Sequence, residues 1–430
     1  MPANPDFDMM QCIEDLWFQR RDLVSDGFDA SLDYLGKLIP LEIHAVPSGT
    51  QCWTWTVPEK WSVGEAYIEE AGSGRRVLDV ADHPLHVVSY SLPVDKELPR
   101  EELLRHIITN PARPHAIPFG YKYYERDWGF CLQHDRLGEF TKDRYRAVIR
   151  SSFEKGTLKV GCCTIPGETE ETVALIAHLC HPAMVNDDLC GVAVGAKLAQ
   201  ELAQRKNRYT YKIFFLPETI GSIAYLSTHE EIIPRVSYGI FLEMLGNDNI
   251  HALQLTRQGN TRWDRIARYV LRRKGTEFRE GPFRMVVGND EMVWNGPGVD
   301  IPTISISRFP YPEYHTSDDT PAIISAERLR ESKELVMTML HILDNDYVPT
   351  RTFKGPVFLS GYGLWVKLEE NRELNRKMEQ VMLRLEGRCS VFDIADELDL
   401  DFDYLLGYLD TYYRNGLITK RQLNTKKCGT

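Results

Sequence analysis

Four short apolar segments of this 430-residue chain each lead to a residue that can bind a metal ion or transfer a proton. The segments are residues 173–177, 211–216, 238–242 and 301–306, and the residues that follow them are His178, Glu218, Glu243 and His315. Short apolar runs between polar, proline or glycine residues are typical of buried strands in a mostly parallel sheet, and ligands bind beyond the carboxyl ends of such strands. The pattern therefore predicts that the four side chains converge on one site at the edge of an α/β sheet.

Length, charge and cysteine content narrow the class of protein. A chain of 430 residues is expected to form two or three domains. The net charge of -11 opposes attraction to phosphate backbones, so nucleic acid is not expected as the main partner. No run approaches the roughly 20 apolar residues of a membrane span, and residues 1–10 lack the features of a signal peptide, so we expect a cytoplasmic protein without a membrane segment. The cysteines have no regular spacing and are expected to be reduced.

The spacing of apolar and turn-forming residues divides the chain into four parts. Residues 1–45 carry the spacing of two helices, which we expect to pack on the central α/β domain. Residues 46–165 contain short alternating segments broken by proline and glycine, which is typical of an inserted β-rich domain. Residues 166–347 alternate apolar strands with helical stretches, which predicts a mostly parallel mixed α/β sheet covered by helices on both faces.

Residues 348–430 show the order helix, helix, helix, strand, which is that of a winged-helix domain. The third helix of such a domain normally reads DNA, but here it carries Asp403 and Asp410, with Arg414 as its basic residue. We therefore expect this part of the chain to contact a protein, or to form a lid over a neighbouring subunit's site in a homo-oligomer.

The strongest local motif spans residues 177–191. It places His178 at the end of a predicted strand and Asp187 in the loop before a helix. An imidazole and a carboxylate are donors that zinc accepts, and the two oxygens of Asp187 could bridge two ions. On the alternative interpretation, His178 packs in the core and Asp188 caps the helix that follows.

Further motifs follow in order along the chain. They are residues 216–222, 241–246, 288–291 and 314–320. Together with residues 177–191 they resemble the zinc aminopeptidase family that includes bacterial leucyl aminopeptidases and glutaminyl cyclases. The resemblance covers about residues 165–345. The complete arrangement, with an inserted β-rich domain and a carboxyl-terminal winged helix, looks like an uncharacterised aminopeptidase-like subgroup of bacterial proteins.

The resemblance implies a role for each matching residue. His178 would be the metal ligand at the end of the first strand, and Asp187 would be the bridging carboxylate. Glu218 falls on the family's general base, which takes a proton from water at the metal and returns it to the leaving amine. Glu243 falls on a terminal carboxylate ligand, and His315 falls on the last ligand.

Two departures from the family pattern affect the ligand set. The family commonly has Glu-Glu where this chain has Glu218 and Thr219; the second Glu is a ligand, and threonine is a poor substitute for it. Cys180 and His181 stand where the family usually has an Asp that supports the first histidine. On one reading, His181 replaces the missing carboxylate and preserves two metals; on the other, one ion binds and His181, followed by Pro182, only shapes the turn. Our hypothesis is that His181 is a ligand.

Three more residues are candidates near the site. The resemblance also implies that Asp319 would orient the second ring nitrogen of His315, as carboxylates do for ligand imidazoles. Asp290 could hold a substrate ammonium or donate to the metal, and we favour it over Glu291; the alternative is a solvated turn. Arg308 could clamp a substrate carboxylate through its planar fork, or simply pair with a surface carboxylate.

The motifs and the resemblance together imply a zinc-dependent, aminopeptidase-like hydrolase. It would hold one or two zinc ions and act on a peptide or small molecule that contains an amide bond. The chain has no Gly-x-Ser-x-Gly elbow, phosphate-binding glycine loop or His-Glu-x-x-His helix. Two alternatives stay open: a mononuclear zinc amidase or cyclase-like enzyme, which Thr219 favours, and a non-catalytic scaffold that binds a partner through the winged helix. Two, one or no bound zinc ions would distinguish the three.

Overall fold

The computed structural model describes residues 7–367 and 371–423. These residues fall into two compact units. One unit is drawn from Met1–Trp263 and Thr276–Glu334, and the other from Asp264–Gly275 and Leu335–Thr430. The first unit contains every residue predicted to form the metal site, so its architecture is the one that positions that site.

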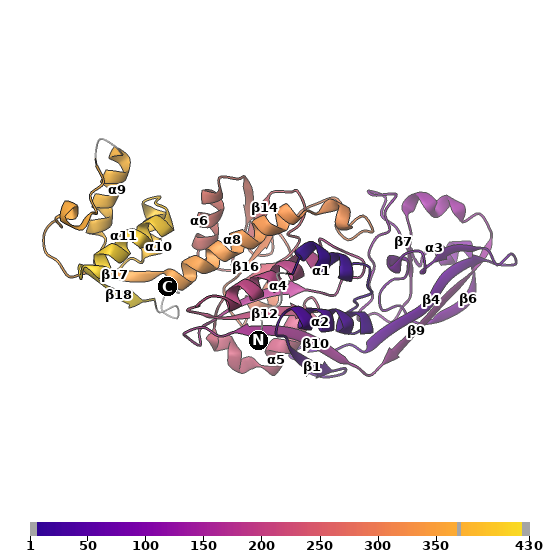
Figure 1. Cartoon of the computed structure of the whole chain (residues 1–430). Helices are drawn as coiled ribbons and strands as arrows, with labels where there is room; N and C mark the ends of the chain where they lie inside the picture. The colour runs from indigo at the N-terminus through magenta and orange to yellow at the C-terminus, as the bar shows by residue number, and fades with distance from the viewer. Residues whose placement is uncertain (1–6, 368–370, 424–430) are drawn as a thin grey trace. The chain divides into compact units, whose positions relative to one another are not determined.

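A mixed eight-stranded sheet forms the centre of the first unit (Figure 1). Its strand order is β1-β10-β12-β11-β13-β16-β14-β15. The strands are β1 (Glu42–Pro47), β10 (Thr157–Ile165), β12 (Thr210–Leu216), β11 (Thr172–His178), β13 (Val236–Leu242), β16 (Thr303–Ser307), β14 (His251–Gln254) and β15 (Phe278–Gly281). The central strands β12, β11, β13 and β16 pair in parallel, whereas β1–β10, β10–β12 and β14–β16 are antiparallel pairs.

Helices cover both faces of this sheet (Figure 1). One face carries α1 (Met9–Leu16), α2 (Asp26–Leu38) and α4 (Leu189–Ala203); the other carries α5 (Ile220–Thr228) and α7 (Glu291–Trp294). Neighbouring residues of a strand point to opposite faces. Phe214 of β12 accordingly packs its ring 4.8 Å from that of Tyr225 in α5, while the next residue, Phe215, faces Gly195 of α4. The predicted α/β fold class is confirmed.

The amino-terminal helices begin at side chains that cap them. Asp8 accepts hydrogen bonds from the first amides of α1, and Ser25 accepts one from the amide of Phe28 in α2. Both helices bury an apolar face, and α1 packs against α4. Helices α1 and α2 thus pack on the side of the central sheet that carries α4.

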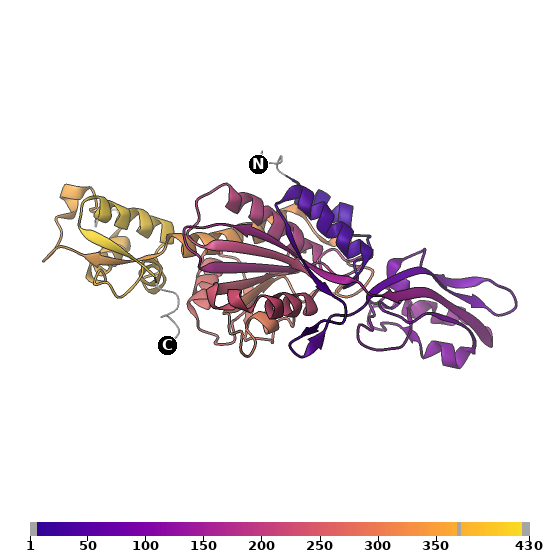
Figure 2. The same ribbon diagram turned by 90° about the horizontal axis from the view of Figure 1, so that it is seen from below.

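Between β1 and β10 the chain forms a second, smaller sheet, drawn in purple in Figure 2. Its four antiparallel strands have the order β5-β4-β9-β6. These strands are β4 (Lys60–Glu70), β5 (Arg76–Asp79), β6 (Val94–Pro99) and β9 (Arg144–Glu154). Shorter elements accompany them: β2 (Gln51–Cys52), β3 (Trp55–Thr56), β7 (Ile107–Ile108), β8 (Phe130–Cys131), α3 (Arg100–Leu104) and the 3-10 turns η1 (Pro84–His86) and η2 (His134–Glu139).

The inserted segment ends earlier than the sequence pattern suggested. Residues 157–165 were expected in the β-rich domain, but they form β10, which pairs with β12 in the central sheet. Most residues of β10 are buried, as expected for a strand with neighbours on both sides. The chain thus leaves the central sheet after β1 and returns to it at Thr157.

The second unit contains three successive helices and then a strand, which is the predicted order. They are α9 (Arg372–Leu383), α10 (Val391–Glu397), α11 (Phe402–Arg414) and β18 (Ile418–Gln422). Ser390 and Asp401 cap α10 and α11, and β18 pairs with β17 (Tyr347–Arg351). The remaining helical elements of the chain are α6 (Arg262–Lys274), α8 (Ala326–Asn345), η3 (Glu230–Arg235), η4 (Pro321–Ile323) and η5 (Leu359–Tyr362). The winged-helix assignment itself stays a prediction.

Within residues 7–367 and 371–423, no helix combines the length and the apolar character needed to cross a membrane.

Candidate metal centre

The predicted donors follow the carboxyl ends of the central parallel strands. His178 is the last residue of β11, Glu243 comes directly after β13, and Glu218 lies two residues beyond β12. The register pairs the last residues of β11 and β12, so these strands end at the same edge of the sheet. His315 reaches this edge from the loop after β16.

Asp187 lies at the centre of the cluster, and its two carboxylate oxygens face different imidazoles. Oδ1 is 2.9 Å from Nε2 of His178, and Oδ2 is 3.0 Å from Nε2 of His315. Although burial raises the pKa of Asp187, the neighbouring His181, His178 and His315 hold it well below its usual range. An ionised carboxylate between two imidazoles is the arrangement expected of a bridging metal ligand.

Oε1 of Glu243 is buried and has no hydrogen-bond partner among the described residues. Nε2 of His178 and Oδ2 of Asp187 are also buried, and their close neighbours are the other members of this cluster. Buried polar atoms in proteins nearly always have a partner, and zinc accepts both imidazole nitrogen and carboxylate oxygen. The donor set therefore fits a divalent metal.

Glu243 is wholly buried behind this cluster. Its second oxygen, Oε2, accepts a hydrogen bond from the side-chain amide of Asn289. Burial, reinforced by nearby carboxylates, raises the pKa of Glu243 well above its usual range. Glu243 is not a member of the two tightest donor groups in the described part of the chain, but its free oxygen is the kind of group that a cation would stabilise.

Two overlapping groups of donors share His181. One group is His181, Asp187 and His315, and the other is His178, Cys180 and His181; within each, the donor atoms lie within 4.8 Å of one another. Nε2 of His181 is 4.0 Å from Oδ2 of Asp187, whereas Nδ1 is 3.1 Å from Nδ1 of His178. Burial lowers the pKa of His181 well below its usual value, and the neutral imidazole is the form that binds a metal. His181 thus lies among the predicted donors, as its proposed role as a ligand requires.

Cys180 is a site residue that the sequence interpretation did not include. Its Sγ lies 3.8 Å from Nδ1 of His181 and accepts a hydrogen bond from the backbone N–H of Glu218 at 3.1 Å. Cys180 and His181 are the pair that stands, in the sequence, where the resembling family usually has an Asp that supports the first histidine. In the sequence, this departure from the family pattern was the feature that could have identified Cys180 as a site residue.

Glu218 lies beside the donors without belonging to their groups. Its Oε2 is 3.6 Å from Nε2 of His181, and its side chain is 27% exposed. Burial raises the pKa of Glu218 to about 7, with the carboxylates of Asp290 and Asp187 acting in the same direction and His178 opposing them. A carboxyl group with this pKa can both accept and release a proton near neutral pH.

Asp290 contacts the turn that follows Glu218. Both of its oxygens accept from the backbone N–H of Thr219, each at 3.1 Å, and Thr219 has a positive φ of 61°. Glu291 accepts from the amide of Asn289. Asp290 and Glu291 are fully buried, so the solvated-turn alternative is wrong. Asp290 therefore holds the turn after Glu218, and its contact with a substrate stays a prediction.

Asp188 has the capping role foreseen in the alternative interpretation of the 177–191 motif. Its Oδ1 accepts from the amide of Gly191 at 2.9 Å at the start of α4. The same oxygen accepts from the amide of Met244 at 3.0 Å, which ties the ligand loop to the residue after Glu243.

Asp319 does not contact His315 as expected. Its carboxylate accepts hydrogen bonds from the backbone amides of Val185, Asn186 and Asp187 at 3.3, 2.7 and 3.1 Å, and from the hydroxyl of Tyr311 at 2.8 Å. These partners engage both oxygens. Asp319 therefore orients the bridging carboxylate rather than the histidine.

The guanidinium of Arg308 is already paired inside the protein. Its guanidinium donates to the carbonyl of Asn249 at 2.5 Å and to Glu331 at 2.7 Å, and its side chain is 3% exposed. A guanidinium that is already hydrogen-bonded in the protein interior cannot also bind a substrate carboxylate. The strand-end arginine is a structural ion pair.

The inserted segment contributes one wall of the site. The amide of Phe119 donates to the carbonyl of His315 at 2.8 Å, and its ring lies 5.0 Å from that of His181 and 5.4 Å from that of His315. On the other side, Tyr314 stacks on His315 at 3.9 Å. Nothing in the local sequence around Phe119 indicated this contact, because it joins residues almost two hundred positions apart.

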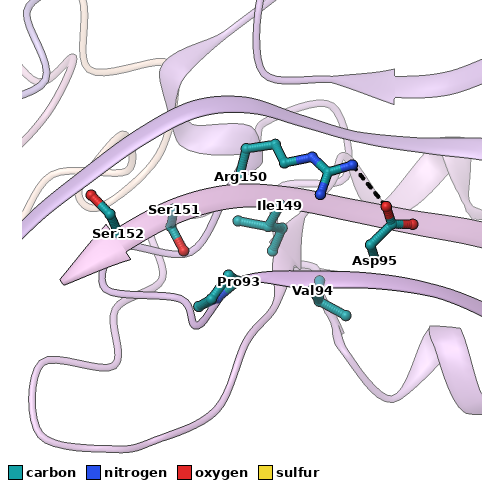
Figure 3. A pocket seen from close by; sticks show the side chains of 7 residues that line it. All are labelled: Pro93, Val94, Asp95, Ile149, Arg150, Ser151 and Ser152. Atoms are coloured by element: carbon teal, nitrogen blue, oxygen red, sulfur yellow. Dashed lines mark hydrogen bonds and ion pairs between the residues drawn. The ribbon is translucent and has the colours of Figure 1, made fainter.

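A separate hollow lies on the small sheet of the inserted segment (Figure 3). Asp95 of β6 and Arg150 of β9 line it and form an ion pair at 2.7 Å. None of the predicted metal donors lines this hollow.

The fold of the chain resembles that of aminopeptidases of known structure. A zinc aminopeptidase from Bacillus subtilis matches with a TM-score of 0.58 and 14% sequence identity, over 78% of this chain and 94% of that chain. At such low identity, the similarity establishes the fold alone. The fold of the present chain is aminopeptidase-like.

The chain as a whole has closer relatives. A crystal structure from Clostridium acetobutylicum, provisionally described as a peptidase, matches with a TM-score of 0.89 and 32% identity over 96% of each chain. A Clostridium acetobutylicum protein, provisionally described as a polysaccharide biosynthesis protein with an aminopeptidase-like domain, is 33% identical over 417 residues, which is 94% of each chain. Residues 10–346 match a family described as a domain of unknown function, DUF4910, and the chain belongs to that family.

Proposed function

We propose that this protein is a zinc-dependent, aminopeptidase-like hydrolase that cleaves an amide bond. The observation that carries the proposal is the arrangement around Asp187, whose two oxygens face different imidazoles beside the buried Oε1 of Glu243, which has no hydrogen-bond partner among the described residues. The aminopeptidase-like fold supports the same reaction class.

Two zinc ions suit the donors that this chain supplies. One ion would be held by His178, Asp187 and Glu243, and the other would be held by Asp187, His181 and His315. In the second set, His181 provides the ligand that Thr219 cannot provide. When bound, zinc polarises the scissile carbonyl and lowers the pKa of water toward about 7.

Proton transfer falls to Glu218 in this proposal. Its carboxylate takes a proton from the attacking water, whose oxygen forms the new bond to the carbonyl carbon. The same carboxyl then gives the proton to the amide nitrogen as the C–N bond breaks, so the amine leaves in neutral form. The pKa of about 7 suits both steps, and Asp290 keeps the adjoining turn in place.

The substrate is a peptide or a small molecule with an amide bond. The carboxylates at the site suit a substrate that carries an ammonium group beside this bond. Since one relative is described in terms of polysaccharide biosynthesis, amides that join an amino acid to an amino sugar belong in a substrate screen. A mononuclear amidase or cyclase-like reaction is the alternative that Thr219 favours.

For the second unit we propose a protein contact, within a homo-oligomer or with another protein. Asp403 and Asp410 on α11 support this role over DNA binding. The cytoplasm is the proposed location, with neither nucleic acid nor membrane as a partner.

Zinc analysis tests the proposed function. We expect two zinc ions per chain by elemental mass spectrometry, and loss of hydrolysis of amino-acyl and dipeptide amides after chelation, with recovery on adding zinc. One bound ion would support the mononuclear alternative. A purified protein that neither contains nor takes up zinc would overturn the proposal and favour the scaffold.

A further inference from the structure

The loop of residues 179–188 connects β11 to α4 and carries both His181 and Asp187. It contains no helix or strand, yet its residues are buried. Buried backbone groups need hydrogen-bond partners. The groups that bind this backbone therefore decide where the donor side chains point.

Arg21 binds carbonyl groups of this loop. Nε donates to the carbonyl of Leu179 at 3.1 Å, and Nη2 donates to those of His181 and Met184 at 2.5 and 3.1 Å. One acceptor belongs to His181 itself, and Leu179 directly follows His178. A single guanidinium thus holds the backbone at two predicted ligands.

The same side chain is anchored in the segment between α1 and α2. Nη1 donates to the carbonyls of Leu16, Trp17 and Gln19. Arg21 is 1% exposed, and in the described part of the chain its hydrogen bonds all end on backbone carbonyl oxygens. A buried cation is costly unless it is fully hydrogen-bonded. Here the cost of burying the guanidinium is offset by hydrogen bonds to backbone carbonyls of two separate segments, which Arg21 joins.

Asp319 binds the following part of the same loop, and it accepts hydrogen bonds where Arg21 donates them. Whereas Arg21 binds carbonyl groups at positions 179, 181 and 184, Asp319 binds the amides of residues 185–187. One buried guanidinium and one buried carboxyl group therefore bind successive halves of the ligand loop.

We propose that Arg21 is a positioning residue that preorganises His178 and His181 for zinc. The inference rests on the proposed zinc-dependent function. Groups that orient metal ligands typically contribute about 10–100-fold in metal affinity. Lysine cannot replace Arg21, because a compact ammonium lacks the planar fork that reaches several carbonyls at once.

The test compares Arg21→Lys with Arg308→Lys, which alters an equally buried arginine outside the ligand loop. Zinc affinity is measured by competition with a chromophoric chelator, and the visible spectrum of the cobalt-substituted proteins reports the ligand geometry. We expect about 10–100-fold weaker zinc binding and an altered cobalt spectrum for Arg21→Lys. Arg308→Lys should change zinc affinity less than about twofold, because its partners do not touch the ligands.

A second variant, Arg21→Gln, distinguishes a loss of ligand positioning from a loss of folding. Arg21→Gln removes the buried charge, whose desolvation is the main cost of this site, while keeping one donor group. It should fold, as judged by circular dichroism, and bind zinc as weakly as Arg21→Lys. Wild-type zinc affinity in either folded Arg21 variant would overturn this inference alone, as would equal weakening in Arg308→Lys. Absence of zinc binding by the unmodified protein would overturn the proposed function as well.

Discussion

Glu218→Gln is expected to lower the turnover of amide substrates about a thousandfold, within the range of about 10²–10⁴ that general acid–base catalysis contributes. Glutamine has nearly the same size but cannot accept a proton. Because Glu218 lies beside the donor groups rather than within them, zinc content and melting temperature should stay close to those of the wild type. The measurements are turnover under saturating substrate and zinc content by mass spectrometry.

Glu231→Gln provides the matched control. Glu231 is exposed on η3, away from the donor cluster, so its neutralisation should leave turnover within about twofold. Near-normal turnover of Glu218→Gln would remove Glu218 from the mechanism. Loss of zinc from that variant would instead make Glu218 a ligand.

His181→Ala is expected to reduce bound zinc from two ions to one and turnover by at least about a hundredfold. The reason lies in the second donor set, where Thr219 leaves no carboxylate to compensate for the lost imidazole. Asp187 and His315 alone would hold an ion only weakly. Zinc stoichiometry after dialysis and turnover of the same sample check this result together.

The control for His181→Ala is His86→Ala. His86 is also a buried histidine, but it lies in the inserted segment, where its ring contacts the carbonyl of Cys131. His86→Ala should lose stability, as large-to-small substitutions do, and keep both zinc ions. If His181→Ala retained its full zinc content and full activity, ligation by His181 would be rejected.

Much of the site could be predicted because it follows a local rule. A buried parallel strand shows itself as a short apolar run, and its carboxyl end lies at the ligand edge of the sheet. This rule led to His178, Glu218, Glu243 and His315 from composition and order alone, and they lie at that edge. Asp187 followed from the local motif of residues 177–191.

The incorrect expectations concern groups with more than one available partner. Asp319 was assigned to His315 from the resembling motif, and Arg308 was considered a substrate clamp because it follows a strand and lies near His315 in the sequence. In the folded chain Asp319 binds backbone amides of residues 185–187, and Arg308 binds Asn249 and Glu331. A charged side chain takes whichever partner packing brings within reach, and sequence proximity does not identify that partner.

The amino-acid sequence was sufficient for the fold class, the strand-end donors and the two departures at Thr219 and Cys180, since each depends on residue type and spacing within a few positions. Arg21 and Phe119 could be recognised only in three dimensions. Arg21 is separated from Leu179 by 158 positions, and Phe119 lies in a segment inserted between two strands of the central sheet. Such contacts arise when the central sheet brings distant segments together, and no local pattern of apolar or charged residues encodes them.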